Sequence, residues 1–192
     1  MTGAAQVLAM ADVRRLQQRA RRGADPYRNE VLLLLSFKAG LRACEMAGLK
    51  WHMVCDARGR VGNHINISGS IAKYGRPRRL PLHANLKRAL ITLRKHTAPG
   101  LDDAIIRSQR GTHMKPRSIV NWFAAMYRDA GLAGCSSHSG RRTFITQAAR
   151  NIAKTGGSLR DVQELAGHRA LTTTERYIEG DRDAQRRLVR LL

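Results

Sequence analysis

The hydrophobic pattern of this chain changes twice along its length, and this constrains the fold more than any other feature. From residue 51 to residue 82 the pattern is extended rather than helical: Val61, Ile65 and Ile67 fall on one face of an alternating strand. Residues 79–82 follow a loop at 73–77 and are expected to form the strand that pairs with this first strand in a hairpin. We therefore predict a small antiparallel sheet of about three strands within an otherwise helical chain.

Helical patterns occupy the chain on both sides of this sheet. A short basic helix over 12–22 is closed by Gly23, and a second helix starts at Asp25-Pro26, carries residues 31–35 into the core and stops at Gly40. Further helices are predicted over 42–49, 84–96, 116–130, 139–153, 158–166 and 172–178. The predicted fold class is mainly α (α+β).

Two of these helices begin with the sequence pattern of a capping box. The patterns are Ser158-x-x-Asp161 and Thr172-x-x-Glu175. Each places a candidate site residue just beyond or within a short, well-anchored helix.

The charge of the chain indicates a polyanionic partner. Its 192 residues fit one domain, and 35 Lys and Arg against 14 Asp and Glu give a net charge of +21. A membrane-surface role is the weaker alternative, because the basic residues are spread along the chain rather than gathered on one amphipathic helix. Three cysteines without C-x-x-C spacing are typical of free thiols in a reducing compartment. Neither a signal peptide nor a membrane-spanning run is predicted.

Six side chains suit a site that holds and attacks a phosphodiester: Arg42, Lys73, His138, Arg141, His168 and Tyr177. Arginine forks can bind two non-bridging oxygens, so Arg42 and Arg141 are the expected clamp on the transition state. A free tyrosine phenol has a pKa of about 10, so cations and a base would have to favour the phenolate of Tyr177.

His138 is the candidate base for that phenol, and His168 would donate to a phosphate oxygen. Lys73, in the loop of the hairpin, would protonate the leaving 5′ oxygen, with Lys50 and Lys87 as competing lysines. Since no acidic cluster accompanies these residues, we predict neither a metal nor another cofactor.

Four segments carry these residues in motifs that resemble one family. Residues 40–51 resemble the G-L-R-x-x-E-x-x-x-L-x-W box of the tyrosine recombinases, also called phage-type integrases, and residues 138–146 are similar to their H-x-L-R-H-T-F box. Residues 165–177 resemble the L-G-H box that ends in the nucleophilic tyrosine, and residues 73–82 are similar to the hairpin that carries the lysine. Four boxes in the right order are a highly specific signal, covering about residues 28–180.

The chain departs from the family pattern at four positions. Gly140 replaces a leucine and Arg142 a histidine in the second box, Ala166 precedes the glycine of the third, and Glu179 stands where a histidine is common. None of these positions removes a catalytic group, so the departures concern packing and partner contacts.

The resemblance implies site-specific DNA recombination. Tyr177 would join the 3′ phosphate and release a 5′ hydroxyl, which on a partner strand would attack the phosphotyrosine, so that neither ATP nor divalent metal is required. The implied partner is double-stranded DNA with inverted-repeat sites, bound by a homotetramer that is monomeric without DNA. The implied location is cytoplasmic and nucleoid-associated, in a bacterium or phage.

The domain organisation has two interpretations. Only 41 residues precede Arg42, so we expect a single catalytic domain over 1–192 with a basic segment (1–24), a tail (179–192) and no separate N-terminal core-binding domain. Its length is similar to that of single-domain recombinases of fimbrial switches, and the alternative is a fragment of a longer integrase. The tail ends in apolar residues and would dock either in cis or on a neighbouring protomer.

Two other functions use similar residues. A type IB topoisomerase would relax plasmid without a specific site. A non-catalytic DNA-binding regulator would have a decayed active site, and the intact set of six residues argues against this.

Beyond the catalytic set, basic side chains are expected to contact DNA phosphates. These are Arg14, Arg15, Arg19, Arg22, Arg76, Arg78, Arg79 and Arg142. Glu45 is expected to pair with an arginine rather than to act as a catalytic acid.

Overall fold

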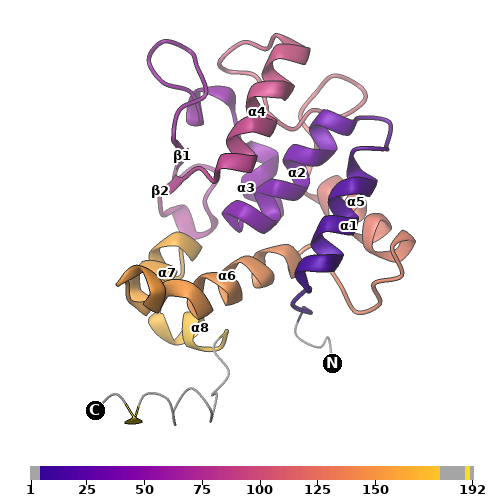
Figure 1. The fold of residues 1–192 in the computed structure, drawn as a ribbon. Coiled ribbons are helices and arrows are strands. Elements are labelled where there is room, and N and C mark those ends of the chain that lie inside the picture. The colour runs from indigo at the N-terminus through magenta and orange to yellow at the C-terminus, as the bar shows by residue number, and fades with distance from the viewer. Residues whose placement is uncertain (1–4, 178–188, 191–192) are drawn as a thin grey trace.

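The computed structural model describes residues 5–177 and 189–190, and it confirms a mainly helical fold with a small antiparallel sheet (Figure 1). The α-helices are α1 (Met10–Ala20), α2 (Pro26–Ala39), α3 (Ala43–Gly48), α4 (Ala84–Thr97), α5 (Pro116–Asp129), α6 (Ser139–Asn151), α7 (Leu159–Ala166) and α8 (Leu171–Glu175). The strands are β1 (His64–Ile67) and β2 (Arg78–Pro81), and short 3₁₀ turns are η1 (Trp51–Met53), η2 (Lys73–Gly75) and η3 (Ile152–Thr155).

Helix α2 is the centre of the main core and contacts α1, α4 and α6 (Figure 1). Proline at its first turn starts it, and residues 31–35 are almost completely buried. It ends as predicted at Gly40, which has a left-handed φ of 61°. A Cβ at this position would lie 2.5 Å from the Phe144 ring, so both the conformation and the close approach of α6 require glycine.

The sheet has two strands in the described part of the chain, where we expected about three. Strands β1 and β2 pair with His64 opposite Pro81 and Ile67 opposite Arg78. The missing strand is reduced to one isolated bridge between Cys55 and Val61, since the chain turns tightly between them. The loop with η2 connects the two strands at the end where Ile67 pairs with Arg78.

A second, smaller core joins α6 to α7. It is formed by Ile145, Val162 and Ala166, with the side chain of Tyr177 packed against it. The Ser158 capping box is confirmed, because the Asp161 carboxylate accepts from the Ser158 backbone at 2.7 Å. The second predicted capping box, Thr172-x-x-Glu175, is wrong.

Helix α8 starts one residue earlier than that box requires. Leu171 is its first residue and Ala170 its N-cap, so Thr172 lies inside the helix and cannot cap it. The buried residue of this helix is Thr174, which faces the site described below.

No helix within residues 5–177 and 189–190 is long and apolar enough to cross a membrane. The predicted tail (179–192) lies outside the described residues except for residues 189 and 190.

Candidate active site

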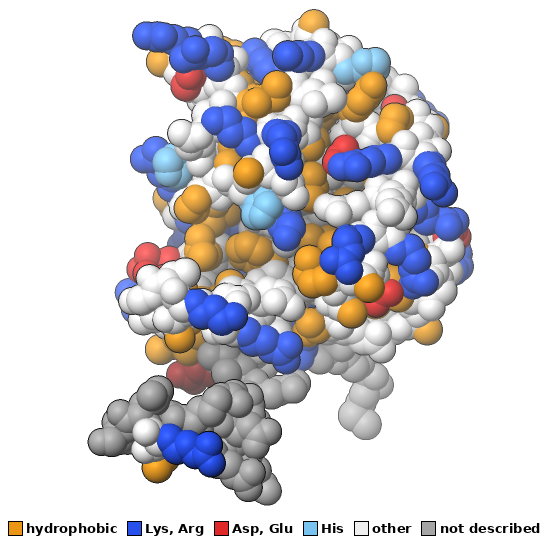
Figure 2. Space-filling model, in the orientation of Figure 1, with side chains coloured by type: hydrophobic (Ala, Val, Ile, Leu, Met, Phe, Trp, Pro, Cys, Tyr) orange, Lys and Arg blue, Asp and Glu red, His pale blue; other side chains and the backbone are white. Residues whose placement is uncertain are grey.

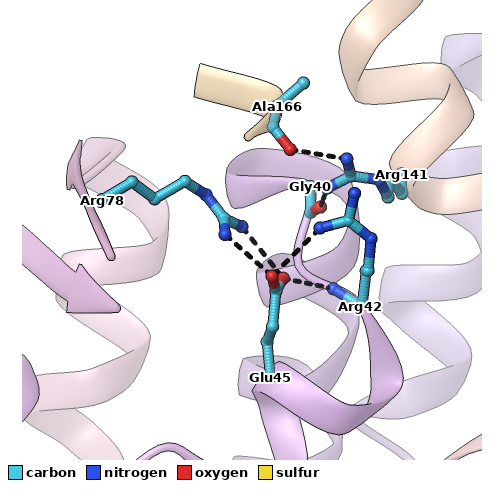
Figure 3. Close-up of polar contacts among 6 residues, drawn as sticks. All are labelled: Gly40, Arg42, Glu45, Arg78, Arg141 and Ala166. Carbon is cyan, nitrogen blue, oxygen red and sulfur yellow. Dashed lines mark hydrogen bonds and ion pairs between the residues drawn. The ribbon is translucent and has the colours of Figure 1, made fainter. Parts of the chain in front are cut away.

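A buried carboxylate organises one side of the site (Figure 3). Glu45 is fully buried and accepts hydrogen bonds from the Arg42 backbone N–H (2.9 Å) and from Arg42 Nη1 (3.1 Å). It also accepts from Arg78 Nη1 (2.8 Å) and Nη2 (2.9 Å). Burial alone would raise the pKa of Glu45, but the hydrogen bonds and charges of Arg78 and Arg42 lower it overall. The pairing role predicted for Glu45 is therefore confirmed.

Arg141 is held by two backbone carbonyls from separate parts of the chain (Figure 3). Its Nη1 donates to the Gly40 carbonyl and its Nη2 to the Ala166 carbonyl, both at 2.6 Å. Only 5% of the residue is exposed, and burial, with the nearby charge of Arg42, lowers its pKa to about 10. The guanidinium stays charged at neutral pH and has a fixed position before any substrate arrives.

His168 and Tyr177 face each other after the turn that ends α7. Gly167 has a φ of 62° and terminates the helix, so that His168 leaves it toward α8. The His168 and Tyr177 rings are stacked with centroids 5.6 Å apart, and His168 Nδ1 lies 2.9 Å from Thr174 Oγ1. Burial lowers the pKa of His168 to about 4, assisted by the charges of Arg141, Arg42 and Arg78. The imidazole is thus neutral at pH 7 in the free protein.

His138 and Lys73 complete the predicted set. His138 is the N-cap residue of α6, and its pKa is lowered by burial and then by the charges of Arg141, Lys73 and Arg42. Lys73 lies exposed on η2, with its Nζ 5.1 Å from the centre of the Tyr74 ring. The competing Lys87 binds Asn63 Oδ1 at 2.7 Å, beyond the other end of the hairpin strands.

The basic residues predicted to contact DNA fall into different positions. Arg14, Arg15, Arg19 and Arg22 are exposed in or just after α1, and Arg76 is exposed beside the hairpin loop. Figure 2 shows that Lys and Arg side chains greatly outnumber Asp and Glu on the face drawn. This distribution fits a polyanion along the surface.

The remaining three predicted DNA contacts differ in their surroundings. The Arg142 guanidinium is 5.6 Å from the centre of the Tyr177 ring, and Arg79 Nη2 is 3.0 Å from His64 Nδ1. Arg78 does not fit its predicted role: its side chain is 9% exposed and both terminal nitrogens bind Glu45. Sequence reasoning treated it as one more basic residue of the hairpin and so missed this pairing.

Thr174 was also missed by the sequence analysis. Its only sequence signal is its spacing, since it precedes Tyr177 by three residues and so lies almost one helical turn away. A fully buried hydroxyl at this place fixes the orientation of the His168 ring.

The charges of the site define the class of chemistry that it suits. The charges of Arg42 and Arg141 act on both His138 and His168, and the Tyr177 ring stacks on His168. With Lys73 on the adjacent hairpin, this cationic arrangement suits transfer of a phosphoryl group. The phage integrase family matches residues 6–183, and the chain belongs to that family.

The chain is also similar in sequence to individual tyrosine recombinases. The chain is 31% identical over 164 residues to tyrosine recombinase XerC of Myxococcus xanthus, covering 79% of this chain and 50% of the relative. It is 33% identical over 159 residues to XerC of Pseudomonas savastanoi pv. phaseolicola, covering 81% and 49%. The chain therefore spans about half the length of the curated relatives it matches.

Solved structures share the fold at lower identity. The XerA recombinase has a TM-score of 0.75 at 22% identity, over 97% of this chain and 65% of that one. The Tn1549 transposon integrase, solved in complex with transposon right end DNA, has a TM-score of 0.78 at 17% identity, over 100% and 67%.

Proposed function

We propose that this chain is the catalytic domain of a site-specific DNA recombinase that cuts and rejoins strands through a 3′-phosphotyrosyl intermediate. The observation that carries the proposal is the convergence of Arg141, His168 and Tyr177 beside the Arg42–Glu45 pair. Family membership and the DNA complex of the similar Tn1549 integrase support it.

In the proposed cleavage step, the Tyr177 oxygen attacks the scissile phosphorus while the bond from phosphorus to the 5′ oxygen breaks. Arg42 and Arg141 bind the non-bridging oxygens, where negative charge increases in the transition state. The positions of both guanidiniums are fixed in advance by Glu45 and by the two carbonyls, so little reorganisation is needed when the phosphate arrives.

Protons move through the two histidines and the lysine in this scheme. His138 has a lowered pKa and can accept the phenolic proton from Tyr177. His168 is neutral, and if its Nδ1 accepts from Thr174, its Nε2 carries the hydrogen that it donates to a phosphate oxygen. Lys73 protonates the leaving 5′ oxygen. Rejoining reverses these transfers, which requires neither ATP nor a metal ion.

We further propose that the protein binds inverted-repeat sites and assembles on them as a tetramer. The tail (179–192) is the candidate link between protomers, with docking in cis as the alternative. Deletion of residues 183–192 is expected to impair recombination of two sites more than binding to one. Full recombination by the truncated protein would remove the tail from this role.

A covalent-capture assay tests the chemistry. On a nicked suicide substrate that carries the true site, the wild-type chain is expected to form a covalent protein–DNA complex on denaturing gels. Tyr177→Phe should bind the same DNA with unchanged affinity and form none, because it lacks the nucleophilic oxygen. A covalent band from the Phe variant would contradict the assignment.

A further inference from the structure

Arg78 lies where three segments with candidate catalytic residues meet. It belongs to β2, the arm of the hairpin that follows Lys73, and its terminal nitrogens bind both oxygens of Glu45 at 2.8 and 2.9 Å. The same Glu45 accepts from Arg42. On its other side, the Arg78 side chain packs against Gly167, where an added Cβ would lie 3.0 Å from Arg78 Cδ and 3.1 Å from Nε.

The contact between Arg78 and Glu45 is stiff. Two parallel hydrogen bonds between a guanidinium and a carboxylate fix the angle as well as the distance between the groups. Both side chains are almost excluded from water, at 9% and 0% exposure, so the pair is little screened. A lysine at position 78 could supply the charge but not the fork.

The loop that carries Lys73 has few contacts of its own. Residues 73–75 are all exposed, and Tyr74 has a φ of 67°, a left-handed conformation that a non-glycine residue rarely adopts. Two anchors on either side of the exposed residues therefore set where this loop points: the buried Ala72 before them and Arg78 after them. Arg78 pairs with Ile67 in the sheet and with Glu45 in the site.

We propose that Arg78 is a positioning residue, which aligns the Lys73 loop with the Arg42 clamp and with the turn before His168. This inference rests on the proposed function. Because Lys73 must give its proton to the 5′ oxygen as the phosphorus–oxygen bond breaks, misalignment of the hairpin slows the departure of that oxygen. Binding of DNA depends on many other cations and changes little.

The chemical nature of the leaving group tests this inference. A substrate with sulfur in place of the scissile 5′ oxygen releases a thiolate, which needs no proton because a thiol is far more acidic than an alcohol. With the oxygen substrate, Arg78→Lys should slow covalent complex formation by up to about 100-fold, the loss that a displacement of roughly 1 Å can cause. With the sulfur substrate it should react within a few-fold of the wild-type chain.

Two further variants make the result interpretable. Arg88→Lys is the matched control, since Arg88 is exposed on α4 and binds only Asn85 in the described structure; it should change neither rate. If Arg78→Lys does not fold, Arg78→Gln keeps Glu45 with its hydrogen bonds from Arg42 and still offers the carboxylate an amide donor. It should show the same selective recovery with sulfur.

Two outcomes overturn the inference. An unchanged rate on the oxygen substrate would mean that Arg78 does not position the reaction, and an equal loss on both substrates would mean that it acts elsewhere than on leaving-group protonation. Failure of the wild-type chain to form any covalent complex would instead contradict the proposed function itself.

Discussion

Replacement of Gly140 by alanine tests how closely helix α6 crosses helix α2. An added Cβ at Gly140 would lie 2.1 Å from Ser36 Oγ, 2.9 Å from Ser36 Cβ and 3.1 Å from Phe37 Cε2. Ser36 is completely buried, so these atoms cannot move into solvent. Overpacking of this kind costs about 1–3 kcal/mol, whereas helix propensity alone would favour alanine by up to about 1 kcal/mol.

The two effects have opposite signs, and the packing term should dominate. At the upper packing cost of about 3 kcal/mol, the propensity gain leaves a net loss of about 2 kcal/mol. We expect Gly140→Ala to lower Tm in thermal unfolding by about 4–8 °C, since 1 kcal/mol corresponds to roughly 2–4 °C in a domain of this size. Cleavage should also fall, because the next residue is Arg141 and a shift of α6 moves its guanidinium.

A suppressor and a control sharpen this experiment. Ser36→Ala removes the 2.1 Å contact and a hydroxyl without a hydrogen-bond partner in the described structure, so Gly140→Ala should cost less in that background. Gly100→Ala should be nearly neutral, since the nearest atom to its added Cβ is 3.7 Å away. A Gly140→Ala variant at least as stable as the wild-type protein would refute the packing argument.

Three further predictions concern the charged groups. Glu45→Ala should destabilise the protein by about 3–5 kcal/mol in urea unfolding, because it leaves a buried charge on Arg78; a loss below about 1 kcal/mol would contradict this. The pKa of His168 is lowered from its ordinary 6.5 to about 4 in the folded protein. As pH falls, His168 is therefore protonated in the unfolded chain before it is protonated in the folded one, and stability should fall between about pH 6.5 and about pH 4. His168→Asn should make this fall smaller without abolishing it, because the lowered pKa of His138 acts in the same direction; an unchanged profile would exclude the His168 imidazole as a source. Arg42→Ala should abolish cleavage. The DNA affinity of the wild-type protein and of this variant should still fall steeply with salt, since each neutralised phosphate releases about 0.9 counterion. A salt-independent affinity would reject the electrostatic interpretation.

The sequence predicted most of the helices because their signals are local. Proline at the start of α2 and glycine at its end act within one turn of the residues that they affect, and so does the Ser158 cap. The third strand and the Thr172 cap were wrong because tertiary packing decided them. A pattern of alternation does not reveal whether a partner strand lies beside it.

The candidate site could be predicted only in part for a related reason. Motif spacing predicted which side chains carry the chemistry, since each box is contiguous. Spacing could not reveal that Arg78 binds Glu45, because these residues are 33 positions apart and approach only when the hairpin folds onto α3. Surface and buried arginines look the same in a sequence.

The hydrogen bonds of Arg141 have a consequence for the energetics of the DNA binding proposed above. An arginine in water must shed part of its hydration shell before it can bind a phosphate closely. Arg141 loses its hydration when the chain folds, because it is 5% exposed and its Nη1 and Nη2 point at carbonyl oxygens. A phosphate that reaches this position therefore meets a cation that is already dehydrated. The stability of the folded protein, rather than the binding step, bears the cost of that dehydration.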